Sequence, residues 1–207
     1  MRLVLATRNR GKLEELRALL RPLGHELVDL DDVGIAPDAA EDALEEFATF
    51  EENALAKARY FFARCGGLGV LADDSGLEVR ALGGRPGVHS KRFSGRTDLS
   101  ARELDAANNA RLLAELEGRA ERDARFVCAA AYVAKDGESV ARGVVDGRIL
   151  HEPRGGEGFG YDPLFHATEL GRTFGEAGVA EKERVSHRAR AFRALITRAL
   201  AAAGAAH

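Results

Sequence analysis

A short polar loop near the N-terminus has the residues to bind phosphate. The apolar run 3–6 stops at the segment 7–12, TRNRGK, and leucines at helical spacing follow. This pattern predicts a strand, a turn and a helix, and the backbone N–H groups at such a junction favour a bound phosphate. A Walker A loop reads G-x-x-x-x-G-K-[ST], but this chain has Ala6 and Leu13 in place of the first glycine and the magnesium-binding hydroxyl. A polyphosphate bound here would therefore need its metal from another part of the chain.

The segment 71–79, LADDSGLEV, offers carboxylates for such a metal. An apolar strand over 68–72 runs into Asp73 and Asp74, and a second short strand over 77–82 is expected after the turn. Oxygen ligands of this kind suit a hard cation at the end of a strand. Alternation along a strand would point the two carboxylates in opposite directions, so we expect different roles for them. The alternative is an Asp-Ser-Gly turn without any catalytic part.

A long helical pattern precedes this pair, and we expect the helix to begin near Glu45. Glu46, Asn53 and Lys57 are seven and four residues apart, which places them along one face of that helix. A carboxylate, an amide and an ammonium in one row suit a metal and a phosphate chain. A solvated, charged helix face is the alternative.

Two further groups lie in the C-terminal third. Phe159 and Tyr161 stand between glycines in the segment 155–165, where aromatic rings suit stacking on a base, although they also suit docking on the core. Ser186 is a candidate N-cap of the last helix, so His187 and Arg188 would project from its first turn. Cations there oppose the helix dipole, which indicates a bound anion or carbonyl or, alternatively, an ion-paired surface.

The elements that must position these residues alternate between strand and helix patterns, which predicts an α/β fold. Two strand patterns meet at Asp136-Gly137, an antiparallel hairpin signal that argues against a purely parallel sheet. The last helix should pack through Phe192, Leu195 and Ile196. We find no internal repeat or low-complexity linker, so residues 1–207 are expected to form a single domain.

Composition narrows the class of protein. The chain has 207 residues, 30% of them charged, and its formal net charge of −3 gives no basic field for a nucleic-acid partner. No apolar stretch is long enough for a membrane span. Cys65 and Cys128 lack ligand spacing, so we expect buried thiols in a reducing cytoplasm.

Together these segments resemble the inosine/xanthosine triphosphate pyrophosphatase family. Six motifs occur in family order and nearly span the chain: T-x-N-x-x-K at 7–12, TFEENALAKA at 49–58, LADDSGLEV at 71–79, LGGRPGVHSKRFSG at 82–95, GEGFGYDPLF at 156–165 and EKERVSHRARA at 181–191. The resemblance implies a curved mixed α/β sheet with flanking helices that form two lobes around a nucleotide cleft. It also implies a magnesium ion (Mg2+), a cytoplasmic homodimer and a purine nucleoside triphosphate as substrate.

The resemblance also implies roles for individual residues. Asp74 matches the catalytic base and a metal ligand, and Glu45 or its neighbour Glu46 matches a second metal ligand. The substrate-binding positions are Thr7, Arg8, Asn9, Arg10, Gly11, Lys12, Lys57, Ser75, Phe159, Gly160, Tyr161, Asp162, Lys182, His187 and Arg188. The ambiguity at the acidic pair arises because Phe47 stands where relatives have glycine, which shifts an ungapped alignment by one residue. His89, Lys91 and Phe93 replace the Tyr, Ala and Tyr common in the family, and we expect no change in chemistry from them.

The implied activity is hydrolysis of deaminated purine nucleoside triphosphates (ITP, dITP, XTP) to the monophosphate and pyrophosphate, which cleanses the nucleotide pool. The alternative is a purine-nucleotide-binding protein without catalysis, for which loss of the carboxylate at Asp74 would be the signature. A nucleotide kinase would require an acceptor site and a complete P-loop.

Overall fold

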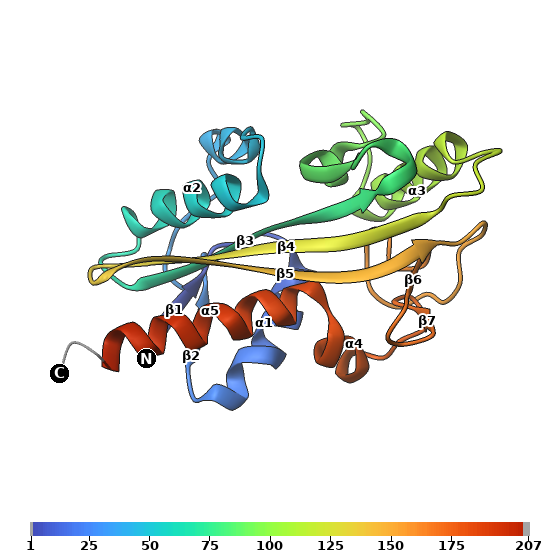
Figure 1. Ribbon diagram of the computed structural model, residues 1–207. Helices are drawn as coiled ribbons and strands as arrows, with labels where there is room; N and C mark the ends of the chain where they lie inside the picture. Colours follow the sequence, from blue (N-terminus) through green and yellow to red (C-terminus); the bar gives the residue numbers. More distant parts are fainter. Residues whose placement is uncertain (1, 205–207) are drawn as a thin grey trace. The chain divides into compact units, whose positions relative to one another are not determined.

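The protein is an α/β protein built on one mixed sheet (Figure 1). The computed structural model describes residues 2–204, and within them seven strands lie in the order β2-β1-β3-β4-β5-β6-β7. Strand β1 pairs in parallel with β2 and β3, whereas β6 pairs antiparallel with β5 and β7. The strands are β1 Arg2–Leu5, β2 Glu26–Asp29, β3 Gly69–Val79, β4 Asp123–Ala134, β5 Gly137–Ile149, β6 Phe165–Ala167 and β7 Arg172–Thr173, and the α-helices are α1 Arg10–Leu20, α2 Phe50–Phe62, α3 Ala101–Glu115, α4 Val179–Val185 and α5 His187–Gly204.

The described residues divide into two compact units. Unit 1 comprises residues 2–74, 128–143 and 188–204, and unit 2 comprises residues 75–127 and 144–187. Each unit has its own hydrophobic core, so each positions its own candidate functional residues. The single domain with a nucleotide cleft between two lobes stays a prediction.

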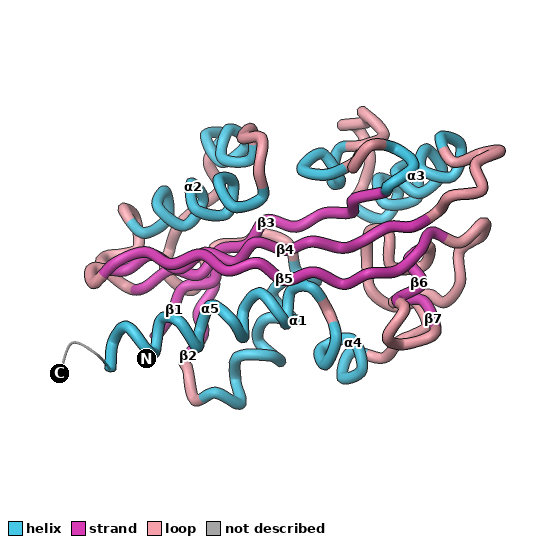
Figure 2. The backbone as a smooth tube through the Cα atoms, viewed as in Figure 1, coloured by secondary structure: helices cyan, strands magenta, loops and turns pink. Residues whose placement is uncertain are grey.

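In unit 1, helices cover both faces of the strands (Figures 1 and 2). Helices α1 and α5 bury Leu16, Leu20 and Phe192 against strand residues such as Leu71. Helix α2 lies on the opposite face and buries an apolar stripe that includes Phe61. The buried side chains on these strands therefore meet α1 and α5 on one face or α2 on the other.

The core of unit 2 is aromatic. The rings of Phe126, Phe165 and Phe174 pack with centroids 4.6–5.9 Å apart, and Leu112 of α3 and its C-cap residue Leu116 join the same cluster. The segment 150–164 contains no helix or strand, as its glycine content predicts. This core therefore fixes one end of an irregular segment that carries several candidate residues.

Several local predictions are confirmed. The N-terminal segment forms strand, loop and helix, and β4 and β5 are neighbours joined by Lys135-Asp136, so the hairpin is present. Ser186 has the extended backbone of an N-cap residue (φ −63°, ψ 150°), and α5 begins at the next residue. Cys65 and Cys128 are buried free thiols.

Two predictions about element boundaries are wrong. Asp73 and Asp74 do not lie in a turn between two strands, because β3 continues from Gly69 to Val79 without a break. The local turn propensity is overridden because both carboxylates find side-chain partners within the sheet layers, as described below. Helix α2 begins at Phe50 and not near Glu45, because Thr49 caps it by accepting a hydrogen bond from the Glu52 amide.

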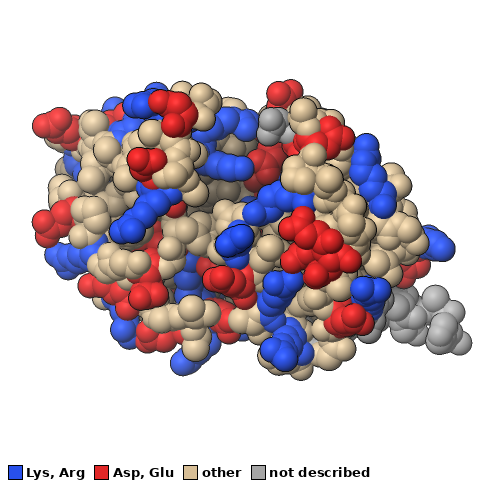
Figure 3. Space-filling model, turned by 180° about the vertical axis from the view of Figure 1, so that it is seen from behind, with Lys and Arg blue, Asp and Glu red and all other residues tan. Residues whose placement is uncertain are grey.

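The surface carries mixed charge. On the face shown in Figure 3, basic and acidic side chains are interspersed, which agrees with the small net charge of −3. In the part of the chain that the structure describes, no helix combines the length and the hydropathy needed to cross a bilayer.

Candidate active site

The phosphate-loop candidate is organised by its own polar side chains. Asn9 is the N-cap of α1, and its Oδ1 accepts a hydrogen bond from the Lys12 amide at 3.1 Å. The Asn9 amide in turn donates to Thr7 Oγ1 at 3.2 Å. Arg10 and Gly11 occupy the first turn of the helix, where N–H groups have no partner within the helix. The loop therefore presents backbone donors, as the sequence predicts for a phosphate site.

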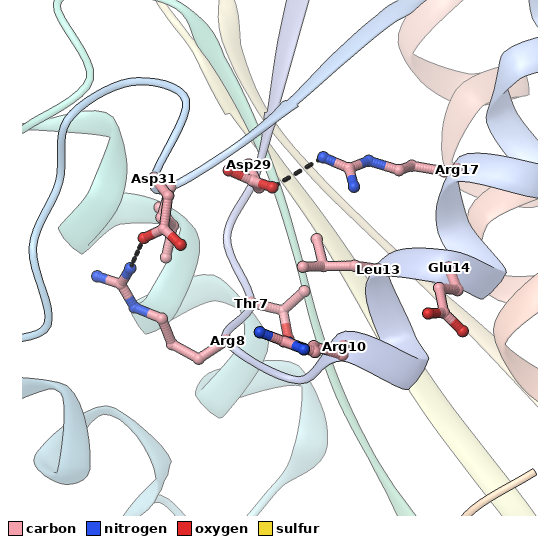
Figure 4. A pocket seen from close by; sticks show the side chains of 9 residues that line it. Thr7, Arg8, Arg10, Leu13, Glu14, Arg17, Asp29 and Asp31 are labelled. Atoms are coloured by element: carbon pink, nitrogen blue, oxygen red, sulfur yellow. Dashed lines mark hydrogen bonds and ion pairs between the residues drawn. The ribbon is translucent and has the colours of Figure 1, made fainter.

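The Arg8 side chain has a structural task beside this loop. Its guanidinium donates to Glu41 at 2.9 Å and to Asp31 at 3.0 Å, and the contact with Glu41 raises the pKa of Arg8. Figure 4 shows Arg8 and Arg10 at a pocket of about 310 Å³ that α1 and the end of β2 also line. Arg8 thus ties the loop to the segment 31–41.

A buried cluster forms on the α1 and α5 face of β3. Asp73 Oδ2 lies 3.1 Å from Lys12 Nζ and 3.3 Å from Arg188 Nε, and Arg188 also pairs with Glu15. Asp73 and Arg188 are both almost completely buried. Burial alone would raise the pKa of Asp73, but the cations Lys12 and Arg188 hold that pKa well below its usual range. Asp73 is therefore an ionised anchor that fixes the phosphate-loop lysine.

Asp74 points to the opposite face, as the strand alternation predicts. Its Oδ2 accepts a hydrogen bond from Asn53 Nδ2 of α2 at 2.9 Å, and Asn53 Oδ1 accepts one from the Phe47 amide. Burial raises the pKa of Asp74, and Glu45 adds to this effect, while Lys12 and Lys57 oppose it. A carboxylate with a raised pKa is a better proton acceptor than an ordinary aspartate, which suits a general base.

Lys57 connects the two acidic segments. Its ammonium pairs with Glu45 and donates to the Asp73 carbonyl at 3.0 Å. Burial would lower the pKa of Lys57, but Glu45, Asp73 and Asp74 raise it, so the ammonium stays charged. Glu46 is exposed. Of the two glutamates, Glu45 is thus the one that lies with Lys57 and Asp74.

The oxygen atoms at this place fit a magnesium ion. Glu45 pairs with Lys57, whose ammonium donates to the carbonyl of Asp73, the residue next to Asp74. Among the described residues no group of three or more Asp, Glu, His or Cys side chains could hold a metal. Magnesium, however, keeps several waters and is usually held by one or two carboxylates together with substrate phosphates. Two neighbouring carboxylates beside a phosphate loop meet that requirement.

In unit 2, the segment around Phe159 is held by an acid and a lysine. Asp162 Oδ2 accepts hydrogen bonds from the Phe159 amide at 2.9 Å and from Lys182 Nζ at 2.6 Å, and Lys182 lies 5.0 Å from the centre of the Phe159 ring. Gly158 has φ +75°, and a Cβ there would come within 2.1 Å of Asp162 Oδ2. These contacts hold the Lys182 ammonium close to the Phe159 ring.

The other candidates of unit 2 are less open. Tyr161 is buried, and its hydroxyl donates to the Ser90 carbonyl at 2.9 Å, so only its backbone is available to a ligand. The His187 ring stacks on Phe126 with centroids 4.7 Å apart and an interplanar angle of 9°. Ser75 is half-buried within β3, directly after Asp74.

Comparison with known proteins decides the family. The sequence model of the Ham1 family matches residues 3–198. The chain belongs to the Ham1 family. It is 50% identical over 190 residues to a protein of Syntrophobacter fumaroxidans named dITP/XTP pyrophosphatase, which covers 91% of this chain and 78% of the relative. A protein of the same name from Mycolicibacterium paratuberculosis is 53% identical over 200 residues, which covers 94% of this chain and 93% of the relative.

Solved structures of the Ham1 family agree with this fold. The HAM1 protein of Coxiella burnetii is 36% identical with a TM-score of 0.81, over 97% of this chain and 98% of that one. A nucleoside-triphosphatase (dITP/XTP pyrophosphatase) from Mycobacterium abscessus is 44% identical with a TM-score of 0.70, over 94% and 97% of the two chains. The mixed α/β fold predicted from the sequence is confirmed.

Sequence reasoning missed the partners that hold the site residues of this Ham1 protein. It assigned no role to Glu15, Glu41 or Asp105, although each contacts a candidate residue or its backbone. It noted Asn53 but not its contact with Asp74. The sequence signal that could have predicted such a contact is a polar residue on a largely buried helix face. A buried polar group without a hydrogen-bond partner lowers the stability of the fold, so a partner is expected there.

Proposed function

We propose that the enzyme hydrolyses inosine, deoxyinosine and xanthosine triphosphates to the monophosphate and pyrophosphate. The observation that carries this proposal is identity of about 50% with proteins named dITP/XTP pyrophosphatase over more than nine-tenths of the chain. The cluster of Lys12, Lys57 and Asp74 supports it, because phosphoryl transfer needs positioned cations and an oriented water.

Unit 1 supplies the phosphate contacts in this proposal. Lys12 and Lys57 bind phosphate oxygens as point charges. The backbone of the loop 7–11 and the Thr7 hydroxyl donate further hydrogen bonds, assisted by the positive end of α1. Because Asp73 fixes Lys12 and Glu45 fixes Lys57, both ammonium groups are oriented before the substrate arrives.

Glu45 and Asp74 would hold magnesium, which when bound neutralises charge on the phosphate oxygens. Asp74 orients the attacking water and accepts its proton, and the hydrogen bond from Asn53 holds its carboxylate in place for that transfer. The bond that breaks joins the α-phosphorus to the oxygen that bridges it to the β-phosphorus, so pyrophosphate leaves as one unit.

The residues around Phe159 and His187 are the base contacts in this proposal. Phe159 stacks on the purine, and Lys182 and Asp162 hold the segment around it. His187 donates to the 6-oxo group, an acceptor that hypoxanthine and xanthine have and adenine lacks. Sites that hydrogen-bond a substrate group reject analogues without that group by roughly 10⁴-fold or more. Guanine also has a 6-oxo group, so its rejection requires a second contact at C2.

Arg188 has two roles in this proposal. The family resemblance implies that Arg188 is a substrate-binding residue, and that contact stays a prediction. Its hydrogen bonds with Asp73 and Glu15 support an additional role in holding the anchor of Lys12.

The test is to incubate the protein with magnesium and ITP, and to measure IMP, pyrophosphate and orthophosphate. We expect IMP and pyrophosphate in equal amounts. Orthophosphate as the only inorganic product would overturn the proposal, and ITP binding without turnover would favour the nucleotide-binding alternative. The predicted homodimer and cytoplasmic location remain to be tested by sedimentation and by fractionation.

A further inference from the structure

Two side chains of α3 hold the backbone of a single residue in the Phe159 segment, Gly160. Asp105 Oδ2 accepts a hydrogen bond from the Gly160 amide at 2.8 Å. Asn109 Nδ2 donates one to the Gly160 carbonyl at 2.9 Å. The two side chains are four residues apart, so they lie one turn apart on the same face of the helix. Both polar groups of Gly160 are therefore taken by one helix, an arrangement that we call the Gly160 clamp.

The Gly160 clamp also determines what the backbone can offer to a base. The Gly160 amide donates to Asp105 and the Phe159 amide donates to Asp162, so neither is available to a 6-oxo group. What this segment can present is the ring of Phe159, whose backbone is held on both sides. Gly160 has φ +63°, a conformation in which few other residues are stable, so the ring direction depends on this turn.

The Gly160 clamp is not built for stability alone. The Asn109 Oδ1 atom is buried and accepts no hydrogen bond from the residues that the structure describes. Burial raises the pKa of Asp105, and the negative charge of Asp162 adds to this effect. Apolar side chains at both positions would leave the Gly160 N–H and C=O without these partners. The polar pair is therefore explained by the backbone of Gly160 that it orients.

We propose that Asp105 and Asn109 are positioning residues for purine binding, which act by fixing the backbone of Gly160 and with it the stacking face of Phe159. This inference rests on the proposed function. Stacking is insensitive to base identity because every base has a π-face, so the clamp serves affinity for all purine nucleotides and not the choice among them.

The neighbouring residue Asn108 provides a matched control. It makes the same two kinds of hydrogen bond, accepting from the Ser94 amide at 2.7 Å and donating to the Lys91 carbonyl at 3.0 Å, but it holds a different segment. Replacing Asn108 should lower the melting temperature without a specific effect on purine binding. Asp105→Asn serves as the conservative variant, because its amide oxygen can still accept from Gly160.

The experiment measures kcat and KM for ITP and ATP, with the melting temperature, in wild type and in Asn109→Ala, Asp105→Leu, Asp105→Asn and Asn108→Ala. We expect the first two variants to raise KM for both nucleotides by roughly tenfold with kcat changed little, the pattern of lost uniform binding. Asp105→Asn should have a KM close to that of wild type. Asn108→Ala should lower the melting temperature without raising KM. If Asn109→Ala or Asp105→Leu does not fold, the same measurements are made on Asn109→Ser instead.

The outcomes separate the two proposals. A wild type that releases no pyrophosphate from ITP would defeat the proposed function. A wild type with normal turnover whose clamp variants change KM no more than Asn108→Ala does would defeat the inference and leave the function standing. A fall in kcat at constant KM would also defeat it, because the residues would then act on the chemical step.

Discussion

Replacing Asp73 with asparagine tests whether this carboxylate is an anchor and not the catalytic base. The substitution keeps the size of the side chain but removes the charge that Lys12 and Arg188 share. Breaking a buried ion pair by removing one partner costs roughly 3–5 kcal/mol. The amide keeps one hydrogen-bond acceptor and Arg188 keeps Glu15, so we expect the lower end, about 3 kcal/mol.

That loss predicts a change in melting temperature. For a protein of this size, 1 kcal/mol corresponds to about 2–4 °C, so the variant should melt roughly 6–12 °C below wild type. The control is Asp98→Asn, which removes an exposed pair with Arg96 (N–O distance 2.9 Å) and should leave the melting temperature nearly unchanged. Equal melting temperatures for wild type and Asp73→Asn would refute the assignment of a buried, ionised anchor.

The pH dependence gives an independent check. Because the pKa of Asp73 is lowered in the folded state, its contribution to stability is complete above the unfolded value of about 3.9 and is lost as the pH falls through the folded pKa. The difference in melting temperature between wild type and Asp73→Asn should thus stay constant from about pH 8 to pH 5 and shrink below about pH 4. A difference that disappeared near neutral pH would mean that Asp73 is protonated in the native protein.

Three further predictions concern catalysis. Asp74→Asn should keep nucleotide binding but turn over at least ~10²-fold more slowly, and a larger loss in Asp73→Asn would mean that the two roles are reversed. Lys12→Ala should lower kcat/KM for ITP, XTP, GTP and ATP by a similar factor, because a contact with phosphate carries no information about the base. His187→Phe keeps the stacking on Phe126 and should reduce the preference for ITP over ATP. Excess chelator should abolish pyrophosphate release and added magnesium should restore it; full activity in chelator would contradict the metal requirement.

Several structural features of this protein follow from local patterns in its sequence. Asp73 and Asp74 must face opposite sides of the sheet once they lie on a strand, because side chains alternate along it. Ser186 ends one helix and precedes the next, and Asn9 caps α1, because short polar side chains satisfy the first N–H groups of a helix. Each of these features depends on neighbours within a few residues.

Other features were decided only by the tertiary structure. Asp73 meets Arg188, 115 residues away, and Gly160 meets Asp105, 55 residues away. The choice of Glu45 over Glu46 as the partner of Lys57 depends on where the 3-10 helix Ala39–Glu45 ends. Buried charges and amides must find partners wherever packing brings them together, and no local periodicity encodes which distant element arrives there. For the same reason β3 runs unbroken through a sequence that, taken alone, favours a turn.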